Sequence, residues 1–85
     1  MDPQTCVYGV LEIDGVQTLI VAGKNRYGLY CEYSAMRVGW TECVPPPEAA
    51  TRLKVSIVWK NLLVALGGCT LYVYNHNPGE DEPWS

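Results

Sequence analysis

The sequence predicts an all-β fold, a small antiparallel sandwich or barrel of about six to seven strands. Three observations support this prediction. Asp14-Gly15 separates two apolar runs, and this dipeptide is a strong signal for a two-residue hairpin turn. Apolar and polar residues alternate from Leu53 to Lys60, as in a half-buried strand. Turn-forming residues such as Gly67-Gly68 recur at short intervals between the apolar runs.

The first half of the chain contains the clearest local pattern. Residues 5–13 and 16–22 predict a hairpin, because Asp14-Gly15 suits a type I′ turn with positive φ at both positions. A turn over residues 23–26 and a third strand over 29–33 follow. Residues 38–44 predict a fourth strand that Gly39 weakens.

The second half admits two interpretations. Strands over 52–59 and 62–66 would turn at Lys60-Asn61, and a strand over 69–75 would follow. The alternative is an α+β fold, in which an antiparallel sheet packs against one helix spanning about 47–66. The β-branched side chains of this stretch lose rotamer freedom in a helix, so strands are favoured. Their expected core face consists of Leu53, Val55, Ile57 and Trp59.

The predicted domain organisation is a single globular β domain over residues 1–75 and an acidic, flexible tail over 76–85. Pro45-Pro46-Pro47 ends the strand before it and acts as a stiff connector. Trp84 is the only large apolar residue of the tail. It either docks on its own domain or serves as a ligand for another protein.

Charge and composition limit the classes of molecule that the protein is expected to bind. The 85 residues carry a net charge of −3 with a pI of about 4.9, and the six Lys and Arg residues are scattered. We therefore expect no nucleic-acid partner. The first residues are polar and acidic, and no apolar run approaches the roughly 20 residues of a membrane span, so we expect no membrane partner and a cytoplasmic location. Hydrophobic residues make up 48% of the chain, which suggests either ordinary apolar surface or an interface.

Four cysteines, Cys6, Cys31, Cys43 and Cys69, lack the paired spacing of a zinc site. Reduced core thiols are the favoured interpretation, ahead of one or two disulfides, with metal ligation third. We expect no cofactor and no metal. No sequence motif pairs the only histidine, His76, with a cysteine nucleophile. The carboxylates resemble surface charges, so we expect no enzyme activity.

Two stretches, PEAATRLKVSIVW and LGGCTLYVYN, resemble the calcium-and-lipid-binding sandwich domains of phosphoinositide lipid kinases. The resemblance covers less than half of the chain and includes no diagnostic motif. It implies a β-sandwich.

A chain of this size without catalytic residues is expected to act by occupying a surface. The predicted function is a protein-binding domain, an inhibitor or adaptor on a larger enzyme or complex. The alternative is a structural subunit that self-assembles into a homo-oligomer. Aromatic and arginine side chains dominate binding hot spots. The predicted partner-binding residues are therefore Arg26, Tyr27, Tyr30, Arg37, Trp40 and Trp84.

Overall fold

Every regular element in the described part of the chain is a strand. The computed structural model describes residues 5–35, 39–48, 50, 53–76 and 82–85. Within them, seven strands form two antiparallel sheets, and no helix occurs. The prediction of a small all-β sandwich is confirmed, and the helical alternative for the second half is wrong for the residues described there.

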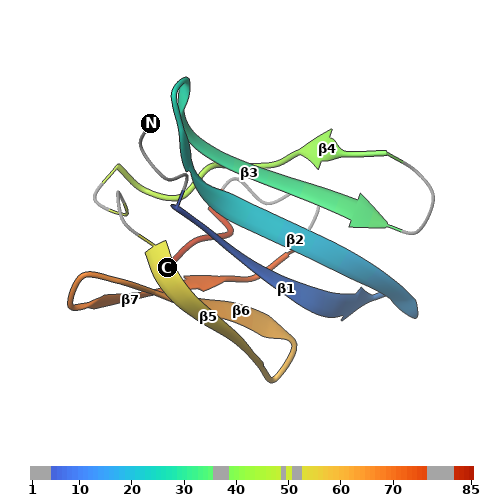
Figure 1. The fold of residues 1–85 in the computed structure, drawn as a ribbon. Coiled ribbons are helices and arrows are strands. Elements are labelled where there is room, and N and C mark those ends of the chain that lie inside the picture. The colour runs from blue at the N-terminus through green and yellow to red at the C-terminus, as the bar shows by residue number, and fades with distance from the viewer. Residues whose placement is uncertain (1–4, 36–38, 49, 51–52, 77–81) are drawn as a thin grey trace.

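The first sheet has the strand order β1-β2-β3-β4 (Figure 1). Its strands are β1 (Thr5–Ile13), β2 (Val16–Asn25), β3 (Gly28–Ala35) and β4 (Thr41–Glu42). The β1–β2 turn has positive φ at Asp14 (51°) and Gly15 (80°), as a type I′ turn requires. The hairpin predicted from this dipeptide is confirmed.

Three elements of this sheet differ from the prediction. β3 extends beyond the predicted 29–33 to Gly28–Ala35. β2 continues to Asn25, and the turn follows at Arg26–Tyr27, where the Asn25 side chain accepts a hydrogen bond from the Tyr27 amide at 2.8 Å. The local side-chain hydrogen bond thus places the turn later than the glycine alone suggested. β4 pairs over two residues only, so it is shorter than the strand predicted over 38–44, and Gly39 before it has a positive φ of 33°.

The second sheet has the strand order β5-β6-β7. It contains β5 (Leu53–Trp59), β6 (Leu62–Gly67) and β7 (Thr70–Tyr74). Lys60 and Asn61 join β5 to β6 with φ values of 49° and 61°, which confirms the predicted turn. The β6–β7 turn lies at residues 68–69, one position later than Gly67-Gly68.

The two sheets face each other and enclose one core (Figure 1). The strand β1 approaches the second sheet so closely that a side chain at Gly9 would not fit. A Cβ there would lie 2.7 Å from Cγ2 of Val58 and 2.8 Å from Cδ1 of Leu63. The core residues are Val7, Leu11, Ile20, Ala22, Cys31, Ala50, Leu53, Leu63, Ala65, Tyr72, Tyr74 and Trp84.

Side-chain hydrogen bonds hold β1 beside β5. The Asn61 side chain accepts from the Glu12 amide at 2.8 Å and donates to the Glu12 carbonyl at 2.7 Å. The Ser56 hydroxyl donates to the Tyr8 carbonyl at 2.8 Å. These contacts satisfy three backbone groups of β1 with side chains from β5 and from the β5–β6 turn, and so link the two sheets.

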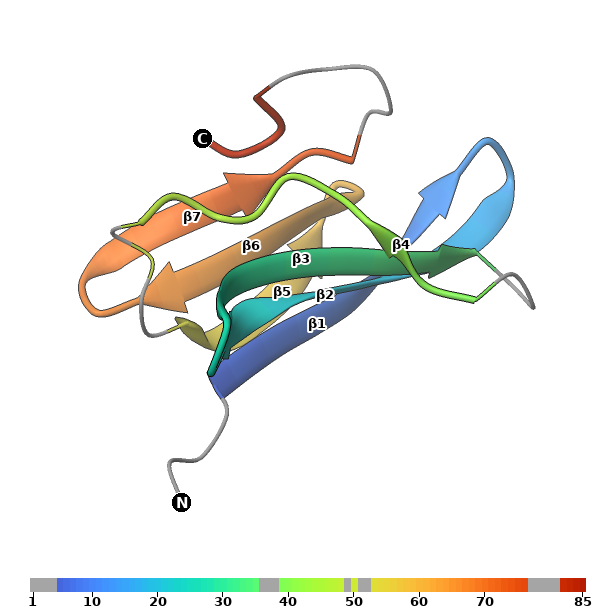
Figure 2. The same cartoon turned by 90° about the horizontal axis from the view of Figure 1, so that it is seen from above.

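The described end of the predicted tail packs on the domain. Figure 2 shows it running along β7 on the side away from β6. The backbones of Ser85 and Val73 exchange two hydrogen bonds of 2.9 Å, and the Asn75 amide donates to the Pro83 carbonyl. Trp84 is 9% exposed, stacks near Tyr74 and donates from Nε1 to the Val44 carbonyl at 2.8 Å. Residues 77–81 lie outside the described part, so flexibility of the whole tail stays a prediction.

No helix in the described residues is long and apolar enough to cross a membrane.

His76 is buried between aromatic side chains. Its Nδ1 lies 2.7 Å from the Tyr74 hydroxyl, and its ring is 4.5 Å from the Tyr33 ring in an edge-on contact. Burial disfavours the charged imidazolium and lowers the pKa of His76 below its ordinary value.

This burial makes stability depend on pH in a defined direction. In the unfolded chain His76 should titrate near its ordinary pKa of about 6.5, so below that pH the unfolded state binds a proton that the folded state does not. The free energy of unfolding should therefore be constant above the unfolded pKa and fall as the pH drops below it. Urea unfolding at a series of pH values measures this slope.

The variant His76→Gln is the matched control, since His76 is the only histidine and carboxylates titrate near pH 4. The slope around pH 6 should disappear in the variant, whatever its absolute stability. An equal slope of unfolding free energy against pH in both proteins would contradict the assignment of this pH dependence to His76.

Candidate protein-binding surface

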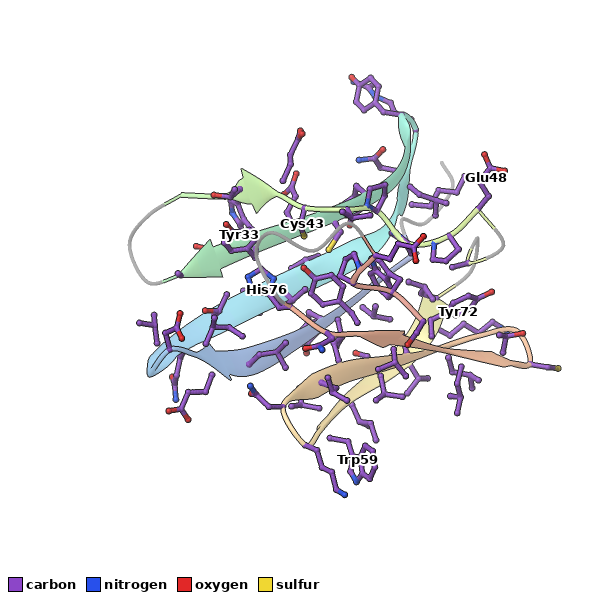
Figure 3. The ribbon with its side chains drawn as sticks, turned by 180° about the vertical axis from the view of Figure 1, so that it is seen from behind. Tyr33, Cys43, Glu48, Trp59, Tyr72 and His76 are labelled. Carbon is purple, nitrogen blue, oxygen red and sulfur yellow. The ribbon has the colours of Figure 1, made fainter. Side chains whose placement is uncertain are left out.

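The outward face of the second sheet is lined by apolar side chains, most of them exposed. On β5, Ile57 is 59% exposed and Trp59 is 55% exposed. Leu71 on β7 is 63% exposed. Figure 3 shows Trp59 pointing away from the first sheet, whereas Tyr72 is buried among the core residues.

These positions correct the core face expected for β5. Of its four residues only Leu53 is buried, and Val55, Ile57 and Trp59 lie on the outside. The cause is a β-bulge. Leu53 pairs with Gly67 and Val55 with Leu66, which leaves Lys54 as an extra residue. One inserted residue moves the following side chains to the opposite face of the sheet.

Cross-strand pairing makes this face continuous. Val55 pairs with Leu66, which pairs with Leu71. In the next row Val64 lies between Ile57 and Val73, and beyond it Trp59 pairs with Leu62. We call the set the outer apolar face: Val55, Ile57, Trp59, Leu62, Val64, Leu66, Leu71 and Val73.

The outer apolar face is hollowed rather than flat. An open hollow of about 350 Å³ is lined by Ile57, Trp59, Leu62, Val64, Leu71 and Val73. At its edge the Lys60 ammonium lies 4.7 Å from the centre of the Trp59 ring, within the range of a cation–π contact. The surface thus combines an apolar floor with a cationic rim at the β5–β6 turn.

The predicted binding residues Arg26 and Tyr27 lie together at the tip of the β2–β3 turn. Tyr27 is 82% exposed, and the Arg26 guanidinium sits 4.9 Å from its ring centre while donating to its hydroxyl at 2.8 Å. Their exposure suits a contact with a partner. Their role stays a prediction.

The other predicted residues do not join this pair in one patch. Trp40 is exposed, but it stands one position beyond the Tyr33–Thr41 pair, roughly 20 Å along β3 from the turn at 3.3 Å per residue. Tyr30 is half-buried, and burial raises its pKa. Arg37 lies outside the described residues, and Trp84 is committed to contacts inside the domain.

One feature of the sequence, the apolar composition of residues 62–66, could have predicted the outer apolar face. Leu62–Leu66 is apolar on both faces of β6, which is typical of a strand covered on both sides. In the described residues only the first sheet covers β6, and it covers one side. A doubly apolar strand in so short a chain therefore indicated an uncovered face.

The described residues hold no group of three or more His, Cys, Asp or Glu side chains that could bind a metal ion. No protein-family model, no curated protein and no solved structure matches the chain. The resemblance to the lipid-kinase sandwich domains therefore has no support from these comparisons.

Paired substitutions can separate the two faces of the second sheet. Leu63→Ala removes a fully buried side chain and should cost about 2–5 kcal/mol of unfolding free energy. Ile57→Ala changes an exposed position and should cost under about 1 kcal/mol. Denaturant unfolding of both variants measures the difference. Equal large losses would mean that Ile57 is buried and would contradict the assignment of the faces.

Proposed function

We propose that this protein is a non-catalytic protein-binding domain and that it binds through the outer apolar face. The supporting observation is the continuity of that face across three strands. Apolar patches larger than a few hundred Å² are uncommon on monomers and mark interaction sites. Trp59 and Ile57 on β5 would act as anchors, since a few large, mainly aromatic side chains supply most of the energy of an interface.

The size of the surface is compatible with specific binding. From the exposed fractions of its side chains, the outer apolar face presents on the order of 600 Å². A standard interface covers roughly 800 Å² on each partner, including a polar rim. Lys54 within β5 and Lys60 in the β5–β6 turn are both exposed and would contribute to such a rim. A partner with an apolar ridge and acidic neighbours would suit this surface.

The proposed role is that of an inhibitor or adaptor that occupies a surface on a larger enzyme or complex. Blocking or bridging requires only shape and burial, and neither needs a reactive group on this chain. A cytoplasmic location is part of the proposal.

Self-assembly into a homo-oligomer is the second candidate, and one observation favours it. The outer apolar face covers an entire sheet, and two copies of such a face can stack as sheets do in a sandwich, about 10 Å apart. A two-fold axis would bring each face onto its own copy. The occupant would then be a second copy of this chain.

Sedimentation velocity from micromolar to near-millimolar concentration tests the second candidate. The face variant is Ile57→Lys with Leu71→Lys. The control is Tyr8→Lys with Val10→Lys, which alters exposed apolar positions on β1. Self-association should appear in the wild type and the control and weaken at least about tenfold in the face variant, since a buried unpaired charge is costly.

Strictly monomeric wild-type protein at every concentration would rule out self-assembly through this face. The same three proteins then serve as baits for affinity capture. A captured protein that rebinds in purified form to the wild type and the control, and not to the face variant, supports the inhibitor or adaptor role. Equal retention by all three would contradict binding through this face.

A further inference from the structure

We propose that Cys31 and Cys43 form a reversible disulfide that fastens the segment after β4 to β3. Their Sγ atoms lie 2.7 Å apart. The Cys43 amide donates to the Cys31 carbonyl at 2.9 Å, so the two residues face each other one position beyond the Glu32–Glu42 pair. Directly opposed residues have Cα atoms about 4.5–5.5 Å apart, within the range that a disulfide spans.

The other two cysteines provide an internal contrast. Cys6 and Cys69 are exposed and lie on different sheets, in β1 and in the β6–β7 turn. Neither has a second sulfur among its hydrogen-bond partners in the described residues. Proximity therefore selects one pair out of the four cysteines.

The two paired thiols differ in burial and in pKa, and this difference predicts which of them reacts first. Cys43 is half-buried, whereas Cys31 is buried. Hydrogen bonding with Cys31 lowers the pKa of Cys43, while hydrogen bonding with Cys43 and burial raise the pKa of Cys31. The thiolate is the attacking species in thiol–disulfide exchange. Cys43 is thus the attacking residue and Cys31 the resolving one.

The oxidant is a low-molecular-weight disulfide such as oxidised glutathione. The Cys43 thiolate attacks one sulfur of oxidised glutathione and forms a mixed disulfide with that half. The other half leaves as the first glutathione and takes the proton that Cys43 has lost. Cys31 Sγ then attacks Cys43 Sγ and breaks the mixed disulfide. The second glutathione leaves and takes the Cys31 proton. The two cysteine sulfurs are oxidised, and one glutathione disulfide is reduced to two thiols.

The bond would secure a segment that few strand hydrogen bonds hold. β4 has only two residues, and the carbonyl of Val44 accepts the Trp84 indole hydrogen bond. Fixing Cys43 to β3 fixes the neighbouring anchor of the C-terminal segment. Because glutathione keeps cytosolic thiols reduced, the bond would close there only when oxidised glutathione accumulates.

The test uses the variant Cys6→Ser with Cys69→Ser, in which only the proposed pair remains. The variant is treated with oxidised glutathione and then unfolded in guanidinium in the presence of an alkylating agent. Its intact mass is measured by mass spectrometry. We expect a mass lower by about 2 Da, no alkylation, and a peptide that links residues 31 and 43. The thermal midpoint should rise by roughly 10 °C on oxidation and return on reduction.

The further substitution Cys31→Ser is the control for the resolving step. It should stop at the mixed disulfide with glutathione on Cys43 and show no rise in the thermal midpoint. If the two-cysteine protein also stops at mixed disulfides, or if both thiols remain free and become alkylated, the proposal is overturned.

Discussion

The packing of β6 and β7 onto the first sheet is the interaction on which the rest of the structure depends. Tyr74, Leu53 and Leu63 are the largest fully buried side chains of the second sheet. They lie in one core with Leu11 and Ile20 of the first. Once these side chains face inward, the strict alternation of a strand sends their neighbours outward. The outer apolar face is therefore a consequence of how the core is filled.

The short length of the chain explains why that face stays open. A domain of this size buries only about 60–65% of the surface of its unfolded chain. The described residues form two layers, and the C-terminal segment lies along the edge of β7 instead of across the sheet. Among these residues no layer lies over the apolar side chains on the far side of β5–β7, and association with another surface would bury those side chains.

Local turn chemistry was readable from the sequence, whereas the choice of buried face was not. Asp14-Gly15 and Lys60-Asn61 sit where left-handed backbone was needed, so both hairpins could be predicted. The face of β5 could not, because the bulge at Lys54 depends on pairing with β6 and leaves no pattern in β5 itself. Of the predicted binding residues, Arg26 and Tyr27 form an exposed pair, while Trp84 finds its partners 10 and 40 positions away in Tyr74 and Val44. Contacts between residues so far apart in the chain leave no pattern in the sequence around either residue, so they could not be predicted.

The central claim is that the outer apolar face is open to solvent in the single chain. Methyl NMR of the dilute protein with a soluble paramagnetic gadolinium chelate tests it most directly. The methyl signals of Val55, Ile57 and Leu71 should broaden strongly, while those of Leu11, Ile20 and Leu63 should not. Protection of Val55, Ile57 and Leu71 at a concentration where sedimentation shows a monomer would contradict the account, because some part of the chain itself would then cover the face.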